Sequence, residues 1–147
     1  MKLSLLLIFV SIFAYGMSAC GASATPNPST KPPSVEDQAG LLNALKAAGA
    51  TVEAGDSIAQ DFFSVEGKTV KVNGADLQVF EYENAEAMEK DASNVAPDGG
   101  SIGTSMVDWI DTPHFYKAGH IITLYIGSDK TVLDLLNTLL GPQFAGR

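Results

Sequence analysis

The sequence predicts an α+β fold: a two-layer sandwich in which a mostly antiparallel sheet of four or five strands carries about three helices. Two observations predict this class. Two stretches have the pattern of strand hairpins, at residues 68–83 and 115–126, and apolar residues at helical spacing precede, separate and follow them. Hairpins with helices between them favour an antiparallel sheet with helices packed on it. The predicted domain covers residues 35–147.

The first predicted helix begins near Ser34 and Asp37, which resemble a capping box. An apolar stripe at helical spacing follows, formed by Leu41, Leu42, Leu45 and Ala48. Gly49 is placed to end this helix in a left-handed turn. Residues 50–53 then have the pattern of a short extended segment.

Asn73-Gly74 is the clearest hairpin signal in the chain, because this pair suits a two-residue type I′ turn. Such a turn fixes the register of the flanking strands. The predicted pairs are Val72 with Ala75, Lys71 with Asp76, Val70 with Leu77, and Thr69 with Gln78. Residues 62–66 are predicted to add a strand before Gly67.

The second half continues with a helix capped by Asn84 and a strand at residues 106–110. The second hairpin turns around residues 117–119, a three-residue loop that would place Tyr116 opposite His120. A last helix begins near Ser128 or Asp129 and is stopped by Gly141-Pro142.

The N-terminus has the pattern of an export signal. Lys2 is followed by the apolar residues 3–15, which would rise only about 20 Å as a helix, less than a bilayer core of about 30 Å. Small residues then lead through Ala19 to Cys20, the only cysteine. This pattern favours a cleaved signal peptide, at residues 1–19.

These residues resemble the lipobox of bacterial lipoproteins, although Met17 stands where the family usually has leucine. The whole chain resembles small uncharacterised lipoproteins of environmental bacteria, and that likeness attaches no activity to the domain. It implies lipidation of Cys20, cleavage before it, and anchoring to the cell membrane or outer membrane with the domain outside the cytoplasm. The alternative is a cut after Ala24, which would release a secreted, cysteine-free protein.

Residues 20–34 are predicted to form a tether between the lipid and the domain. Four prolines and several serines and threonines lie in this segment, which is too polar to bury a core. In extended geometry it could hold the domain up to roughly 40 Å from the membrane. Without residues 1–19 the chain keeps 8 basic against 17 acidic side chains, a formal charge of −9. Nucleic acid is therefore not an expected partner.

Both histidines lie in one stretch, as His114 and His120, with Tyr116 between them and Asp111 just before. This group is the one candidate ligand-binding site, and a metal would need further ligands that no spacing motif supplies. The favoured interpretation is structural: hairpin residues with rings toward the helices and polar tips toward water. No metal or other cofactor is predicted.

The sequence offers no catalytic constellation. No serine lies in a G-x-S-x-G motif, and the glycine-rich residues 99–103 lack the lysine of a phosphate-binding loop. The leading hypothesis is a non-enzymatic, membrane-anchored envelope lipoprotein whose domain binds a protein, such as another envelope protein, or another envelope component. The alternative is metal or small-ligand binding by the hairpin of His114 and His120.

Overall fold

The computed structural model describes residues 34–147, and the predicted signal peptide, Cys20 and residues 20–33 lie outside that part. Its helices are α1 (Gln38–Ala47), α2 (Ala85–Ala92) and α3 (Lys130–Leu140). Its strands are β1 (Val52–Ile58), β2 (Gly67–Val72), β3 (Ala75–Glu81), β4 (Ser101–Ile102), β5 (Ser105–Met106), β6 (Pro113–Ala118), β7 (Ile121–Ile126) and β8 (Ala145–Gly146). Within residues 34–147, no helix has both the length and the apolar character to cross a membrane.

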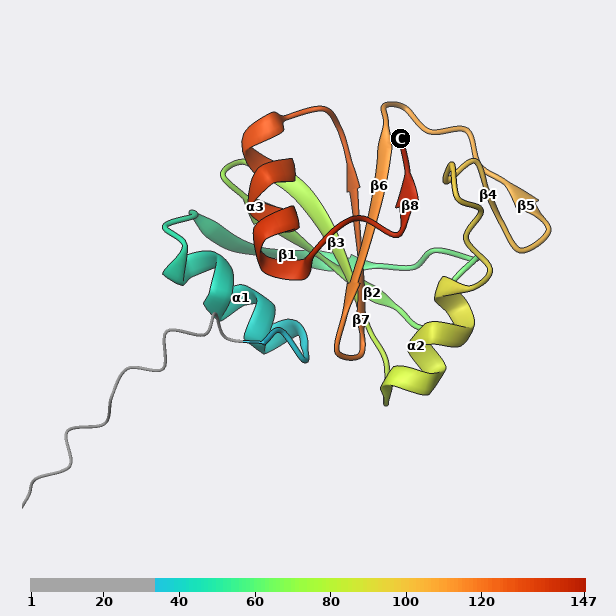
Figure 1. The fold of residues 1–147 in the computed structure, drawn as a ribbon, viewed down its shortest axis with the longest axis horizontal. Coiled ribbons are helices and arrows are strands. Elements are labelled where there is room, and N and C mark those ends of the chain that lie inside the picture. The colour runs from blue at the N-terminus through green and yellow to red at the C-terminus, as the bar shows by residue number, and fades with distance from the viewer. Residues whose placement is uncertain (1–33) are drawn as a thin grey trace, which may run out of the picture.

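Six strands form one antiparallel sheet in the order β1-β2-β3-β7-β6-β8, and β4 with β5 forms a separate small hairpin (Figure 1). The predicted α+β class, with an antiparallel sheet and three helices, is confirmed. The main sheet exceeds the expected four or five strands for two reasons. Residues 52–58 pair along β2 as a seven-residue strand, and residues 145–146 add β8 to β6.

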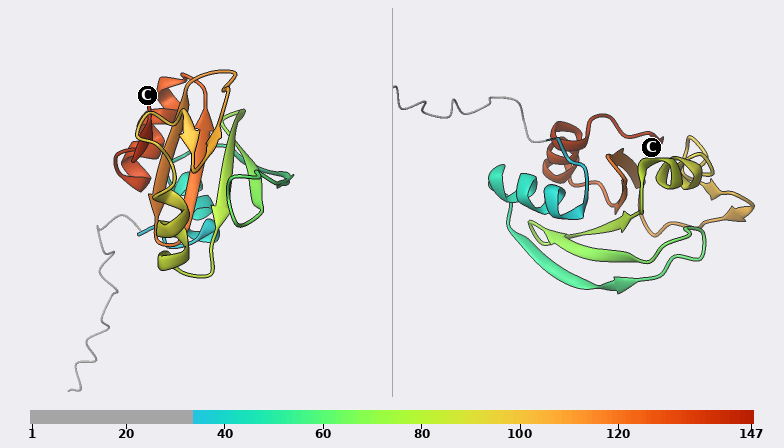
Figure 2. Two further views of the ribbon diagram at one scale, coloured as in Figure 1. Left: turned by 90° about the vertical axis from the view of Figure 1, so that its right-hand side faces the viewer. Right: turned by 90° about the horizontal axis from the view of Figure 1, so that it is seen from below.

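Side chains on both faces of the sheet are buried, which adds a layer to the expected two. Leu77 and Ile121 belong to a core cluster that includes the buried residues of α1 and α3. Phe80 and Ile122, which point to the opposite face, belong to a second cluster with the buried residues of α2. Figure 2 shows α1 and α3 lying together and α2 apart from them.

The hairpin of β2 and β3 has the predicted register. Asn73 and Gly74 both have positive φ angles, 52° and 88°, as a type I′ turn requires. The pairs are Val72 with Ala75, Lys71 with Asp76, Val70 with Leu77, and Thr69 with Gln78. The local turn chemistry was sufficient to fix this part of the sheet.

Two predicted strands are wrong. Residues 62–66 form turns and bends, because the rings of Phe62 and Phe63 fold together (5.0 Å between centroids) and Phe63 packs on Phe80 (4.7 Å). Of residues 106–110, only the first belongs to a strand, β5. The remainder is a loop held by its tryptophan, as described below.

The helix ends follow the predicted chemistry, apart from one cap. Asn84 and Asp129 cap α2 and α3, each accepting a backbone N–H of the first turn. The cap of α1 is Asp37, which accepts from a backbone N–H at 2.6 Å, rather than Ser34. Gly49 adopts the predicted left-handed conformation after α1, with φ of 87°.

The turn between β6 and β7 differs from the predicted three-residue loop. Ala118 pairs with Ile121, so the turn consists of two residues, Gly119 and His120. Gly119 supplies the positive φ, 52°, that lets the strands close this tightly. The partner of Tyr116 is therefore Thr123 and not His120, and that register prediction is wrong.

The chain enters the domain against this turn. The N–H of His120 donates to the carbonyl of Glu36 at 2.9 Å, and a Cβ on Gly119 would overlap the Glu36 backbone. Val35, one residue earlier, is 5% exposed and belongs to the α1–α3 core cluster. Residues 35–36 are thus fixed to the sheet before the first helix begins.

A buried carboxylate joins α2 to the turns before β2. Asp91 is 8% exposed, and its Oδ2 atom accepts three hydrogen bonds. The donors are the N–H and hydroxyl of Ser64, both at 2.7 Å, and the hydroxyl of Tyr82 at 3.1 Å. This network fixes residues that carry no regular secondary structure.

The contact between Tyr82 and Asp91 makes the free energy of unfolding depend on pH in the alkaline range. Burial, and then the charge and hydrogen bond of Asp91, raise the pKa of Tyr82 above its ordinary value. The folded state therefore holds the phenol proton more tightly than the unfolded state. This contribution is complete below the unfolded pKa, about 10, and is lost as pH rises toward the folded pKa.

Urea unfolding at about pH 8 and about pH 11 checks this prediction. We expect a Tyr82→Phe variant to lose less stability between these two pH values than the parent chain. Burial also raises the pKa of Tyr116, so this residue contributes to the loss of stability at alkaline pH as well. A Tyr116→Phe variant measures that second contribution. Equal losses for the parent and for Tyr82→Phe would contradict the assignment to Tyr82.

Candidate interaction site

The β4–β5 hairpin is attached to the chain that follows α2. Ile102 is 2% exposed and forms an antiparallel bridge with Val95. The N–H of Ala96 donates to the carbonyl of Ser101 at 2.8 Å. The hairpin is therefore anchored at its base, and it projects from the end of the molecule opposite α1 (Figures 1 and 2).

Trp109 holds the loop that follows β5. Its indole N–H donates to the carbonyl of Gly99 at 2.7 Å. Its ring meets Phe62 and Phe115 edge to face, with centroids 6.1 and 5.9 Å away. These contacts turn the tryptophan toward the core.

Two large apolar side chains are left almost fully in solvent as a result. Met106, at the end of β5, is 91% exposed, and Ile110, next to Trp109, is 97% exposed. Val107 and Trp109 between them are partly buried against the second core cluster. We call these four residues, Met106, Val107, Trp109 and Ile110, the hairpin surface.

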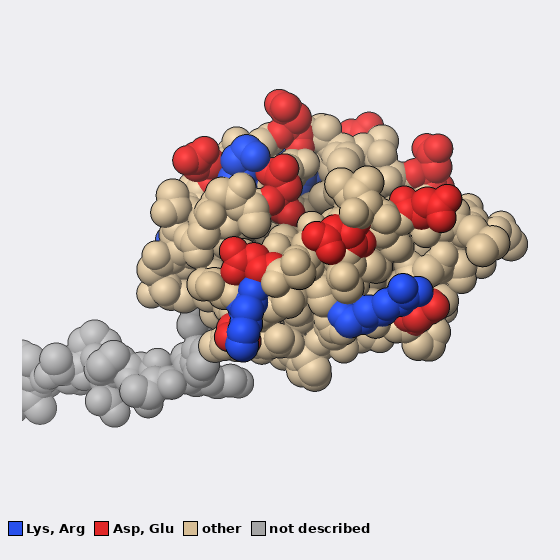
Figure 3. Space-filling model, turned by 90° about the horizontal axis from the view of Figure 1, so that it is seen from above, with Lys and Arg blue, Asp and Glu red and all other residues tan. Residues whose placement is uncertain are grey.

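A pocket of about 400 Å³ adjoins the hairpin surface. Its lining consists of Asp98, Gly100, Val107, Asp108, Trp109, Asp111, Thr112, Pro113 and Arg147. Three carboxylates thus lie around one tryptophan, and the Arg147 guanidinium lies 3.8 Å from Asp98. On the face seen from above (Figure 3), acidic side chains are scattered widely, whereas basic ones occur at a few points.

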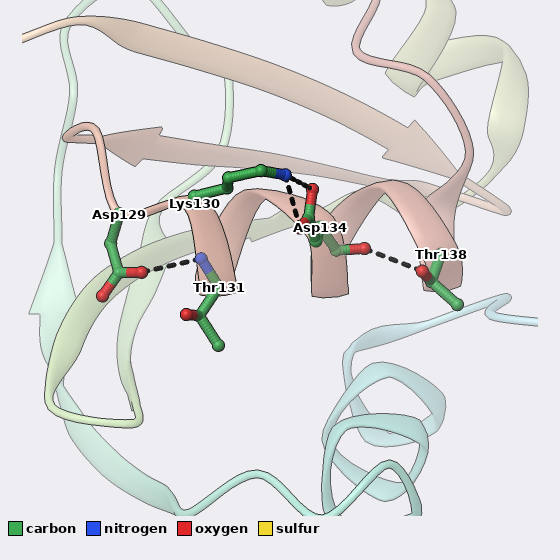
Figure 4. A network of polar contacts seen from close by, with 5 residues as sticks. All are labelled: Asp129, Lys130, Thr131, Asp134 and Thr138. Carbon is green, nitrogen blue, oxygen red and sulfur yellow. Dashed lines mark hydrogen bonds and ion pairs between the residues drawn. The ribbon is translucent and has the colours of Figure 1, made fainter.

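A second hollow, of about 410 Å³, lies between the end of α1 and α3. Its polar groups are used within α3 (Figure 4): Asp134 pairs with Lys130, and its carbonyl accepts from the Thr138 hydroxyl at 2.7 Å. The N–H of Thr131 donates to the cap Asp129 at 2.8 Å. These groups serve the helix, so this hollow is the weaker candidate.

The structure separates the candidate residues that the sequence grouped. His114 and Tyr116 share one face of β6, and both are buried, at 6% and 1% exposed. His114 Nδ1 lies 2.7 Å from Gln143 Oε1, and its ring stacks on Tyr125 at 6.1 Å. Burial and the charge of Asp134 raise the pKa of the Tyr116 phenol, which stays protonated at neutral pH.

His120 and Asp111 lie elsewhere. His120 is in the turn at the far end of β6 from His114, with its Nε2 3.4 Å from Glu81 Oε1. Asp111 lines the pocket beside Trp109 and accepts from the N–H of Thr112 at 2.7 Å. Of the four residues, the structure brings together only His114 and Tyr116.

Comparisons with known proteins give no match to this chain, whether with protein-family profiles, curated proteins or solved structures. Within residues 34–147, no three His, Cys, Asp or Glu side chains gather closely enough to hold a metal ion.

Sequence reasoning missed the hairpin surface because it assigned residues 106–110 to a strand. In a strand, alternate side chains would have been buried in the sheet. A signal was present: Asp108 and Asp111 flank Trp109-Ile110, and carboxylates on both sides of an apolar pair are unusual in a buried strand. That pattern suits an exposed loop.

Proposed function

We propose that this chain is a lipid-anchored, non-enzymatic module of the bacterial cell envelope that binds another protein through the hairpin surface. Cys20 carries the lipid, and the residues after it carry the domain away from the membrane. The buried groups Asp91 and His114 are engaged in side-chain hydrogen bonds that serve the fold. Such use supports a binding role over a catalytic one.

The exposure of Met106 and Ile110 carries this proposal. Apolar residues that lie singly on a surface are common, but here two large ones are almost fully exposed within five residues of chain, at the end of the anchored β4–β5 hairpin and in the loop that follows it. Trp109, which lies between them in the sequence and is only partly buried, is of a residue type that is enriched at energetically important interface positions. Covering these side chains would remove apolar surface from water at about 25 cal/mol per Å².

A protein is a better occupant of this surface than a lipid bilayer. Asp108 and Asp111 flank Ile110 and would have to approach the head groups together with it. The chain has a formal charge of −8, which anionic lipids repel. A protein surface can instead supply complementary positive charge around an apolar centre.

The position of the hairpin agrees with a tethered domain. The N-terminal residues enter beside α1, whereas β4 and β5 project at the opposite end (Figure 1). A domain held through its N-terminal chain presents the hairpin surface away from the attachment point. A partner in the envelope can then reach it.

Site-directed photo-crosslinking in living cells tests this function. A benzophenone amino acid placed at Ile110 in the full chain is expected to give one dominant protein adduct. The same label at Lys130, whose side chain is 84% exposed on α3, is the control and is expected to give no such adduct. The adduct should be lost when Met106→Ser is combined with the label.

A Met106→Ser, Ile110→Ser double variant keeps this test interpretable. Because both side chains are exposed, its free energy of unfolding should stay within about 0.5 kcal/mol of the parent. The absence of an adduct at Ile110, or the same adducts at Ile110 and Lys130, would overturn the proposed function.

A further inference from the structure

We infer that the pocket beside Trp109 takes an arginine side chain of the partner, whose apolar neighbours cover Met106 and Ile110. This inference rests on the proposed protein-binding function and specifies the chemistry of the partner. It joins two features of the structure: the exposed apolar hairpin surface and the adjoining pocket of about 400 Å³.

The charge of the pocket selects a cation. Asp98, Asp108 and Asp111 are all exposed at its rim, in a chain with 17 acidic and 9 basic side chains. An arriving positive charge is attracted by the nearby carboxylates and by the acidic surface as a whole. Opposite charges across an interface mainly set the choice of partner and the rate of association.

The lining of the pocket favours a guanidinium in particular. Trp109 forms part of the wall, and a planar guanidinium stacks on aromatic rings while its N–H groups bind carboxylates in pairs. The ring is already oriented, since its indole N–H is bonded to the Gly99 carbonyl. The orientation of Trp109 is therefore set before a partner arginine binds.

The chain's own Arg147 gives direct support. Its guanidinium lies at this pocket, 3.8 Å from Asp98, with 71% of the side chain exposed. The group is attracted to the pocket but is too far from Asp98 for a hydrogen bond. A loosely held cation of this kind leaves Asp108, and the Asp111 oxygen that does not accept the Thr112 N–H, available to a partner.

The test uses the full chain in detergent micelles and the fluorescence of Trp109, its only tryptophan. The probe is the peptide Gly-Ser-Leu-Arg-Leu-Ser-Gly, and its control has citrulline, a neutral analogue of the same shape, in place of arginine. We expect saturable changes in emission and about tenfold tighter binding of the arginine peptide at low salt. The preference should shrink as salt is added.

Matched variants assign this preference to the pocket. Asp108→Asn with Asp111→Asn should reduce the tenfold preference to about twofold and leave binding of the citrulline peptide unchanged. Glu53→Gln with Asp56→Asn removes the same number of charges from β1, away from the pocket, and should keep the full preference.

The outcomes separate this inference from the proposed function. Equal binding of both peptides, or no change in Trp109 emission with either, overturns the arginine pocket. A preference that survives in the Asp108→Asn, Asp111→Asn variant also overturns it. The benzophenone adduct at Ile110 is measured in cells without these peptides, so it judges the protein-binding function independently.

Discussion

A Cys20→Ser variant is expected to move almost entirely from the membrane fraction to the soluble fraction after signal cleavage. The proposed anchor is covalent lipid on the Cys20 thiol, and serine cannot replace the thiol in that reaction because its hydroxyl is a far weaker nucleophile. Each buried methylene contributes about 0.8 kcal/mol to membrane binding, so two or three acyl chains hold a protein firmly where one does not.

Fractionation with carbonate-washed membranes measures this effect, and mass spectrometry of the N-terminus identifies its cause. The parent chain should begin at a modified Cys20. A parent chain that begins, unmodified, at Thr25 would instead identify a cut after Ala24 and a secreted protein. Equal membrane retention of the parent and of a Cys20→Ser chain from which residues 1–19 have been removed would likewise contradict lipid anchoring through the thiol.

An Asp91→Ala variant is expected to lose about 3 kcal/mol of unfolding free energy. Alanine removes the acceptor for the N–H and hydroxyl of Ser64 and for the hydroxyl of Tyr82. A buried donor without a partner costs about 1–3 kcal/mol, because it gave up water without replacing it.

Urea unfolding followed by circular dichroism measures the loss. Asp91→Asn keeps an oxygen acceptor and should lose less than Asp91→Ala. Glu86→Ala changes an exposed carboxylate on the same helix and should stay within about 0.5 kcal/mol of the parent. If Asp91→Ala and Glu86→Ala unfold at the same urea concentration, the network does not stabilise the fold as described.

The parts of the fold that were predictable are those governed by local chemistry. Asn73-Gly74 fixes a hairpin register because few residues adopt two consecutive positive φ angles. Asn84 and Asp129 cap their helices because a side-chain oxygen satisfies a backbone N–H within the same turn. Neither outcome depends on the rest of the chain.

The parts that were not predictable depend on contacts between distant residues. Phe63 leaves the expected strand because it packs on Phe80, 17 positions later, and Trp109 leaves another because Gly99 accepts its indole N–H. Strand propensity was present in both segments and was overridden by tertiary packing. The face covered by α2 likewise depends on long-range packing.

The candidate site also depended on contacts that local sequence does not determine. The sequence grouped His114, Tyr116 and His120 by proximity along the chain, but a turn one residue shorter than expected moves His120 out of the ladder. The hairpin surface could not be predicted from the sequence, because the exposure of a side chain depends on how the whole chain folds. Met106 and Ile110 are of the same apolar residue types as the core, and only the folded structure shows that no other part of residues 34–147 covers them.

The contact of Glu36 with the β6–β7 turn determines how the domain responds to mechanical load. A pull on the N-terminal chain acts first on the Glu36 carbonyl and the buried Val35, and through the turn on β6 and β7. β7 lies between β3 and β6, so the load is shared by the hydrogen bonds to both neighbours. A load on an outer strand would instead break its hydrogen bonds one after another. A load applied at Glu36 therefore meets the interior of the sheet before it reaches the outer strands β1 and β8.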